Sequence, residues 1–174
     1  MTEIINTDIK LKAQAIIKEA TKEDSNKIAQ IYNHYLGNGT MDLESKSGEY
    51  FYTLIDSHNS KEKLFVTVYD DIVVGYGIIK KYSDREGYRF TAETSIYFDK
   101  NHIGKGYGKL MQAHLLQEAE LLDYKHLVVK IWSSNSGSIK FHKSFGYTIV
   151  GQQNKIGFVN GEWQDVTIMQ YLVA

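Results

Sequence analysis

The 174-residue chain contains no cysteine and no proline. Without cysteine it can form no disulfide, no thiolate metal site and no covalent cysteinyl intermediate. The absence of proline points to no particular function. Long apolar runs are also missing, so no segment of the sequence is expected to cross a membrane.

The chain also lacks an excess of charge of either sign, since its formal net charge is −1. Neither nucleic acid nor an anionic membrane is therefore an expected partner. Residues 1–12 carry Glu3, Asp8 and Lys10 between apolar residues, and they lack the hydrophobic segment of a secretory signal. We therefore expect a cytoplasmic protein with one domain over residues 14–174, preceded by a flexible N-terminal extension over residues 1–13.

The composition, 43% hydrophobic and 24% charged, is typical of a soluble globular protein. Hydrophobic periodicity predicts an α+β fold with a mixed, mostly antiparallel central sheet flanked by helices. A hairpin is predicted over residues 63–82 with its turn near Asp70-Asp71, and another around Asn160-Gly161. The other predicted strands cover residues 14–20, 88–98, 125–132, 147–153 and 162–173, and the predicted helices cover 21–36, 44–58, the segment from the glycine loop to about 122, and 135–145.

The most informative stretch is NHIGKGYGKL (101–110), in which glycines occupy alternate positions between a predicted strand and a predicted helix. Glycine lets the backbone approach a ligand closely, and loop amides together with a helix N-terminus attract anions. A P-loop would need glycine at Ile103 and Ser or Thr at Leu110, while a dinucleotide fingerprint starting at Gly106 would need glycine at Met111. Both are excluded, and a flexible strand–helix turn remains the alternative.

The segment IGKGYG (103–108) resembles the pyrophosphate loop of the GNAT N-acetyltransferases, with Ile103 in place of the usual Gln or Arg. The stretches YRFTAETSIYFDKNHIGKGYGKLM, NSGSIKFHKSFGYTIVG and GEWQDVTIMQ resemble the phosphinothricin and methionine-sulfoximine branch of that superfamily, which includes bacterial amino-acid N-acyltransferases. The match runs in order from about residue 14 to the C-terminus. It implies a single GNAT-like domain, acetyl-CoA as co-substrate and a homodimer.

The resemblance also implies which residues bind acetyl-CoA. The backbone of the strand after the catalytic position would bind the pantetheine arm, and the glycine loop would bind the pyrophosphate. Asn135 matches a family asparagine that bonds the pantetheine arm, and it also suits the N-cap of the predicted helix. The residues concerned are Ile96, Tyr97 and Phe98 on the strand, and Ile103, Gly104, Lys105, Gly106, Tyr107, Gly108 and Lys109 in the loop.

Two side chains are candidates for proton transfer. Glu93 lies within an apolar strand pattern, where an unpaired carboxylate would be costly, so it is either salt-bridged, solvent-facing or functional. By resemblance it is the general base, and His142 is a proton relay or a donor on the CoA side. Without cysteine, direct attack in a ternary complex is the simplest mechanism. No histidine pair has the spacing of a metal site, so no metal is expected.

The acceptor is expected to meet residues 85–90, REGYRF, which resemble a substrate-contacting family segment. Arg89 could grip a carboxylate or phosphinate in bidentate fashion, with Glu86, Gly87 and Tyr88 shaping the wall. A solvated charge at the strand edge is the alternative for Arg89. The leading hypothesis is therefore acetyl transfer to a small amino acid or analogue. The alternatives are another amine (a polyamine, an aminoglycoside or a peptide N-terminus) and a non-catalytic CoA-binding module.

Overall fold

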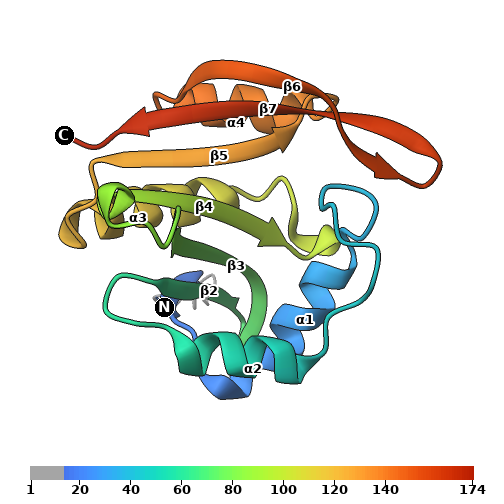
Figure 1. Ribbon diagram of the computed structural model, residues 1–174. Helices are drawn as coiled ribbons and strands as arrows, with labels where there is room; N and C mark the ends of the chain where they lie inside the picture. The colour runs from blue at the N-terminus through green and yellow to red at the C-terminus, as the bar shows by residue number, and fades with distance from the viewer. Residues whose placement is uncertain (1–13) are drawn as a thin grey trace, which may run out of the picture.

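A computed structural model describes residues 14–174, and the expected extension over residues 1–13 lies outside the described part. Seven strands form one sheet in the order β1-β2-β3-β4-β5-β7-β6 (Figure 1). All neighbours are antiparallel except β4 and β5, which run parallel. The predicted α+β class and mixed, mostly antiparallel sheet are confirmed.

The predicted elements are all present, although several ends differ by a few residues because caps and short 3₁₀ turns replace the expected helix or strand ends. The strands are β1 (Ile16–Glu19), β2 (Lys63–Tyr69), β3 (Ile72–Lys81), β4 (Thr91–Phe98), β5 (His126–Trp132), β6 (Thr148–Val159) and β7 (Glu162–Leu172), and the helices are α1 (Ser25–Asn33), α2 (Gly48–Ser57), α3 (Tyr107–Leu121) and α4 (Ser136–Ser144).

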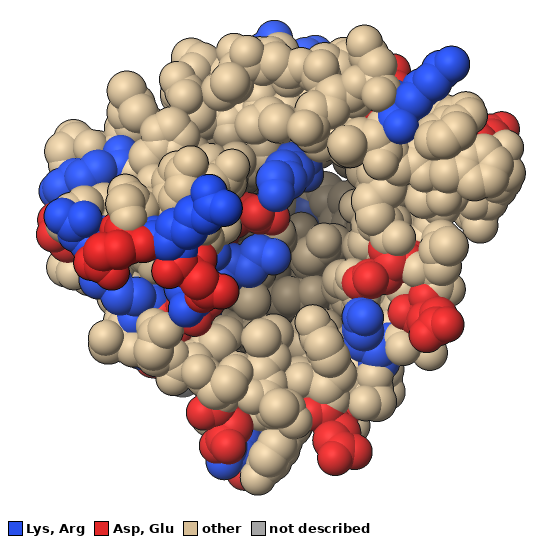
Figure 2. Space-filling view, viewed as in Figure 1, with Lys and Arg blue, Asp and Glu red and all other residues tan. Residues whose placement is uncertain are grey.

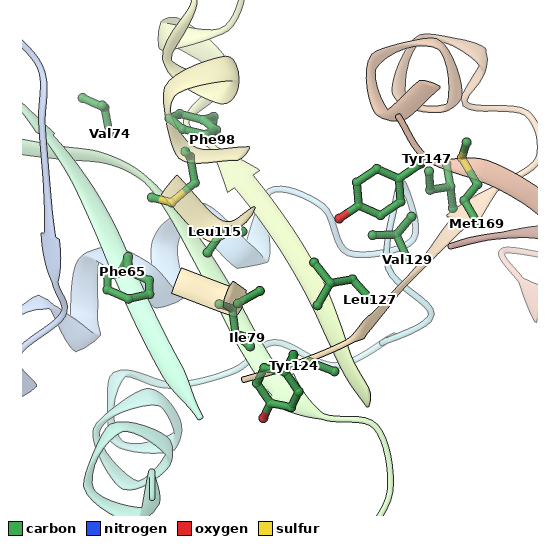
Figure 3. Packing of buried hydrophobic residues seen from close by; sticks show 14 residues of the cluster. Phe65, Val74, Ile79, Phe98, Leu115, Tyr124, Leu127, Val129, Tyr147 and Met169 are labelled. Carbon is green, nitrogen blue, oxygen red and sulfur yellow. The ribbon is translucent and has the colours of Figure 1, made fainter. Parts of the chain in front are cut away.

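Both faces of the sheet are buried, each against its own helices. Successive side chains of β2 alternate between the faces, as the period of a strand requires. Leu64 and Val66 join a cluster with Ile28 of α1 and Phe51 of α2. Phe65 joins the larger cluster, which includes Leu115 of α3 (Figure 3). No helix within residues 14–174 is both long enough and apolar enough to cross a membrane.

Both predicted hairpin turns are confirmed by their backbone angles. Asp70 and Asp71 have φ of 51° and 60°, and Asn160 and Gly161 have 53° and 80°. Two consecutive left-handed residues form the type I′ turn, whose twist matches that of the strands it joins. Asn, Asp and Gly tolerate this conformation best, which is why the dipeptides could be found in the sequence.

Strand β6 ends at Val159 rather than at the predicted residue 153. The pairing shifts between Gln153 and Gly157, and Lys155 takes a left-handed φ of 53° at this irregularity. Asp165 of β7 accepts the Lys155 backbone N–H at 2.6 Å, so the amide freed by the irregularity has a partner. The strand therefore continues, and the long β6–β7 hairpin reaches the 37–42 loop, where the Asn160 side-chain amide donates to the Gly37 carbonyl at 3.4 Å.

Candidate active site

The centre of the sheet is split between β4 and β5. These strands pair only from Thr91 to Glu93, opposite His126 to Val128. Beyond this point β4 continues to Phe98 and β5 to Trp132, but the two no longer pair with each other. The edge of β4 that faces the gap therefore keeps backbone groups available for a ligand.

A cavity of about 340 Å³ lies in this gap, and we call it the split cavity. Its lining includes Ile96 and Tyr97 of β4, Asn135 before α4, and His142 on α4. Phe98 is buried at the end of β4, and its carbonyl accepts a hydrogen bond from the Tyr35 hydroxyl. The structure thus gathers Asn135, His142 and two of the three predicted strand residues around one space.

A second cavity of about 460 Å³ adjoins the first, and we call it the Glu93 cavity. Both are lined by Gly39, Ser95, Tyr97, Lys130 and Trp132, so they are continuous around the middle of β4. Figure 2 shows a hollow on this side of the molecule with both basic and acidic side chains around it. A donor in the split cavity and an acceptor in the Glu93 cavity would meet beside Ser95 and Tyr97.

The glycine loop lies between β4 and α3. Gly104 and Gly106 have φ of 79° and 87°, and a Cβ added to either would meet no heavy atom within 4 Å. Gly106 is also the N-cap of α3 and provides no side chain to cap the helix. The first amides of a 15-residue helix therefore lack a capping side chain and carry the positive end of its dipole. The exposed side chains of Lys105 and Lys109 add positive charge. This geometry suits an anion.

Glu93 is held between two lysines. Lys80 lies directly opposite it on β3, with its Nζ 3.7 Å from Glu93 Oε1. Lys130 lies on β5, two residues beyond Val128, with its Nζ 3.1 Å from Glu93 Oε2. The Glu93 side chain is 17% exposed and lines the Glu93 cavity. The salt-bridged alternative is therefore present in the structure, together with access to the cavity that a functional role requires.

His142 is buried and lines the split cavity. Its Nδ1 lies 2.8 Å from the Ser138 carbonyl oxygen, one helical turn earlier. A carbonyl can only accept, so Nδ1 carries the proton and Nε2 is the free acceptor of the neutral ring. Burial lowers the pKa of His142 below its ordinary value, while the Ser138 carbonyl raises it by a smaller amount. His142 is therefore neutral at pH 7. Its Nε2 must accept a proton before it can donate one.

Comparison with known proteins shows which family the chain matches. A family model described as the acetyltransferase (GNAT) domain matches residues 17–168. The chain belongs to the GNAT family of acetyltransferases. Its relatives include the L-methionine sulfoximine/L-methionine sulfone acetyltransferase of Salmonella typhimurium, 30% identical over 88% of this chain and 92% of the relative.

Other relatives support the same assignment. The L-amino acid N-acyltransferase MnaT of Escherichia coli is 29% identical over 88% of this chain and 91% of its own. A GNAT phosphinothricin acetyltransferase from Sinorhizobium meliloti, solved in complex with AcCoA, superposes with a TM-score of 0.87 at 26% identity, covering 92% of this chain and 89% of that one. The resemblance noted in the sequence is confirmed, and the protein is an acetyltransferase enzyme.

Asn135 of the acetyltransferase lies both at the start of α4 and beside the split cavity, as expected. Its side-chain oxygen accepts the Ser138 backbone N–H at 3.0 Å, which makes it the N-cap of α4. It also lines the split cavity. The N-cap alternative is thus confirmed, and the contact with a pantetheine arm stays a prediction.

Residues 86–89 are not brought to Glu93. Arg89 contacts Glu86, with its Nε 3.8 Å from a carboxylate oxygen, and its guanidinium stacks on the Phe90 ring at 4.6 Å. It lines a separate depression that also includes Lys61. Arg89 and Phe90 form a turn before β4 begins at Thr91, and Arg89 lines neither the split cavity nor the Glu93 cavity. The acceptor role of Glu86, Gly87, Tyr88 and Arg89 stays a prediction, and in this structure Arg89 is a solvated charge before the strand.

The sequence reasoning missed most of the wall of the Glu93 cavity. Lys80 and Lys130 come from strands on either side of β4, and Met41 and Ile156 come from the 37–42 loop and the β6–β7 hairpin. Alternation could have placed the lysines on the face of Glu93 only if the strand register had been known. Within residues 14–174, no group of three or more His, Asp or Glu side chains could hold a metal ion.

The depressed pKa of His142 gives the acetyltransferase a pH-dependent stability. As pH falls below about 6.5, the unfolded chain takes up a proton at this histidine before the folded chain does. Stability is therefore fully present above this pH and decreases below it, by at most about 1.4 kcal/mol per pH unit for one proton.

His142→Asn keeps a side-chain N–H for the Ser138 carbonyl but removes the titration. Urea unfolding between about pH 7.5 and 5.5 should therefore give a shallower loss of stability for the variant. The other histidines are common to both proteins and cancel in the comparison. Identical slopes would show that His142 has an ordinary pKa in the folded protein.

Proposed function

We propose that this acetyltransferase transfers the acetyl group of acetyl-CoA to the amino group of a small amino acid or amino-acid analogue of the methionine sulfoximine or phosphinothricin type. The observation that carries the proposal is the continuity of the split cavity with the Glu93 cavity. One space adjoins an open strand edge and the other contains a carboxylate. Relatives named for methionine sulfoximine and amino acids support the acceptor class.

The residues of the chain fit acetyl-CoA. The free space before Gly104 and Gly106 and the uncapped α3 amides suit the pyrophosphate. The β4 edge at Ile96 to Phe98 and the side chain of Asn135 suit the pantetheine arm. Acetyl-CoA supplies an acetyl group activated as a thioester. The chain has no cysteine, so transfer proceeds directly to the amine in a ternary complex.

Glu93 is assigned as the general base. An acceptor ammonium cannot attack a carbonyl until it loses a proton, and Glu93 is the carboxylate of the Glu93 cavity closest to the split. The other carboxylate lining this cavity, Asp42, accepts a hydrogen bond from the Tyr32 hydroxyl and lies 3.6 Å from the Lys46 ammonium. Asp42 belongs to the 37–42 loop, whereas Glu93 lies on β4 where its pairing with β5 ends, so Glu93 takes the proton directly or through water.

His142 is assigned as a proton relay on the CoA side. Its free Nε2 can accept a proton, because Nδ1 is committed to Ser138. Once protonated, the buried ring would release the proton readily, since burial disfavours its charged form. The order of events is thus acceptance at Nε2 of the extra proton that the acceptor nitrogen still carries after its attack, and then donation of that proton to the departing thiolate. This order favours the relay role over that of a resident donor.

A release assay for free thiol tests the proposal. Acetyl-CoA should be consumed with methionine sulfoximine, methionine sulfone, phosphinothricin or one of the common amino acids. Turnover with polyamines, aminoglycosides or peptides alone would move the function to the alternative acceptors. A protein that binds acetyl-CoA but consumes none with any acceptor would be a non-catalytic CoA-binding module.

A homodimer in the cytoplasm completes the proposal. Apolar side chains that are about half exposed line the β6–β7 hairpin, among them Ile149, Val150, Phe158 and Trp163. Monomers rarely leave so many apolar groups of one element in water, which supports a partner copy on this side. Sedimentation at several concentrations would measure the assembly, and cell fractionation would test the location.

A further inference from the structure

We propose that Lys80 and Lys130 bind the carboxylate of the acceptor and thereby select α-amino acids over amines that lack one. The inference rests on the proposed function and names the residues that recognise its substrate class. It starts from the positions of the two ammonium groups, 3.7 and 3.1 Å from the Glu93 carboxylate, in the cavity where the acceptor amino group must reach that base.

The two lysines can reach a ligand. Their side chains are 49% and 47% exposed, whereas Glu93 is 17% exposed. Both line the Glu93 cavity, and Lys130 also lines the split cavity. Lysine carries its charge on a flexible stem, so each ammonium can turn from Glu93 to a neighbouring anion without a change in the backbone.

The charges around Glu93 do not balance. Two ammonium groups face one carboxylate, and the second carboxylate of the cavity, Asp42, is engaged by Tyr32 and Lys46. A simple cationic amine that approached Glu93 would be repelled by the two ammonium groups. It also has no anionic group that could pair with them. An α-amino acid brings its own carboxylate beside its ammonium. Its ammonium can pair with Glu93 while its carboxylate pairs with Lys80 and Lys130, so every charge has a partner.

The two lysines and Arg89 lie in different depressions of the surface. The Arg89 guanidinium lies in another depression, beside Glu86 and over the Phe90 ring. Arg89 could reach the acceptor only if the 3₁₀ turn Glu86–Tyr88 moved. The lysines already lie in the cavity, so the structure favours them as the carboxylate-binding pair.

The test compares two acceptors that differ only in the charge to be recognised, L-methionine sulfone and its carboxamide. For the wild-type enzyme, kcat/KM should favour the free acid. Lys80→Met and Lys130→Met should each lower the acid-to-carboxamide ratio about three- to tenfold, mainly through the KM of the acid, because each removes one half-exposed ion pair. The difference in basicity between the two amines cancels when ratios are compared between variants.

Two further variants sharpen the result. Lys80→Arg keeps the charge and should keep most of the preference for the acid. Lys63→Met is the matched control, because Lys63 pairs with Glu19 across β1 and β2 at 2.8 Å and lines neither cavity. Its ratio should equal that of the wild type.

Four outcomes would overturn the inference. An unchanged ratio in both methionine variants, or equal losses for the acid and the carboxamide, would reduce the lysines to anchors of Glu93. A ratio lowered by Arg89→Ala instead would transfer the role to Arg89.

Calorimetric titration of the free acid separates this inference from the proposed function. Binding that the lysine variants weaken, without acetyl transfer, supports the lysines and contradicts the function, whereas no binding to the wild type overturns the lysine assignment.

Discussion

Glu93→Gln is expected to lower turnover by about two to four orders of magnitude, which is the contribution of a positioned general base. Glutamine keeps the size of the side chain but cannot accept the acceptor's proton. Acetyl-CoA affinity should change little, because Glu93 lines the Glu93 cavity and not the split cavity. Steady-state kinetics with a saturating acceptor and calorimetric titration with acetyl-CoA measure the two quantities separately.

The loss of a salt bridge needs its own control, since the glutamine also releases Lys80 and Lys130. Glu19→Gln breaks a comparable pair between neighbouring strands, that with Lys63 at 2.8 Å, and Glu19 lines neither cavity. This variant should keep wild-type turnover. If Glu93→Gln behaves in the same way, Glu93 is a structural member of a surface ion pair.

The pH dependence distinguishes a missing base from damaged structure. As the pH rises toward the pKa of the acceptor's ammonium, more of the amine reaches the enzyme already deprotonated. Glu93→Gln should then recover part of its turnover relative to the wild type. A deficit that stays constant from about pH 7 to 9.5 would mean that the substitution harms the site in another way.

Local signals in the sequence were sufficient for most of the fold. The left-handed turns at Asp70-Asp71 and Asn160-Gly161 were predictable because few residues tolerate φ near +55°. The extension of β6 was missed because the partner that stabilises its irregularity, Asp165, lies on the next strand. A local pattern cannot report a hydrogen bond made by a residue ten positions away.

The candidate site, like the fold, was predictable only where its signal is local in the sequence. The glycine loop is continuous in sequence, so spacing alone separated it from other phosphate loops, and the family resemblance then made Glu93 and His142 candidates for proton transfer. The ion pairs of Glu93 were not predictable, because Lys80 and Lys130 lie on two other strands and come together only through the register of β3, β4 and β5. The same long-range information was missing for Arg89, whose position depends on where β4 begins.

Gly106→Val is expected to weaken acetyl-CoA binding about ten- to a hundredfold, a cost of roughly 1.4 to 2.7 kcal/mol. Gly106 has a φ of 87°, a conformation that a β-branched residue strongly disfavours. The valine side chain would also enter the free space in front of the α3 amides, where the pyrophosphate is expected. The first effect acts on folding and the second on binding, so affinity must be measured on a variant shown to be folded.

Gly161→Val separates these two effects. Gly161 has a similar φ of 80° and equally open surroundings, but it lies in the β6–β7 turn, far along the chain from the glycine loop. Both variants should lose thermal stability, since both place valine in a left-handed conformation. Only Gly106→Val should lose affinity in calorimetric titration with acetyl-CoA, because only there does the added side chain occupy the anion site. Equal affinity for acetyl-CoA in the two folded variants would make the loop an ordinary strand–helix turn, and the cofactor would then have to bind elsewhere.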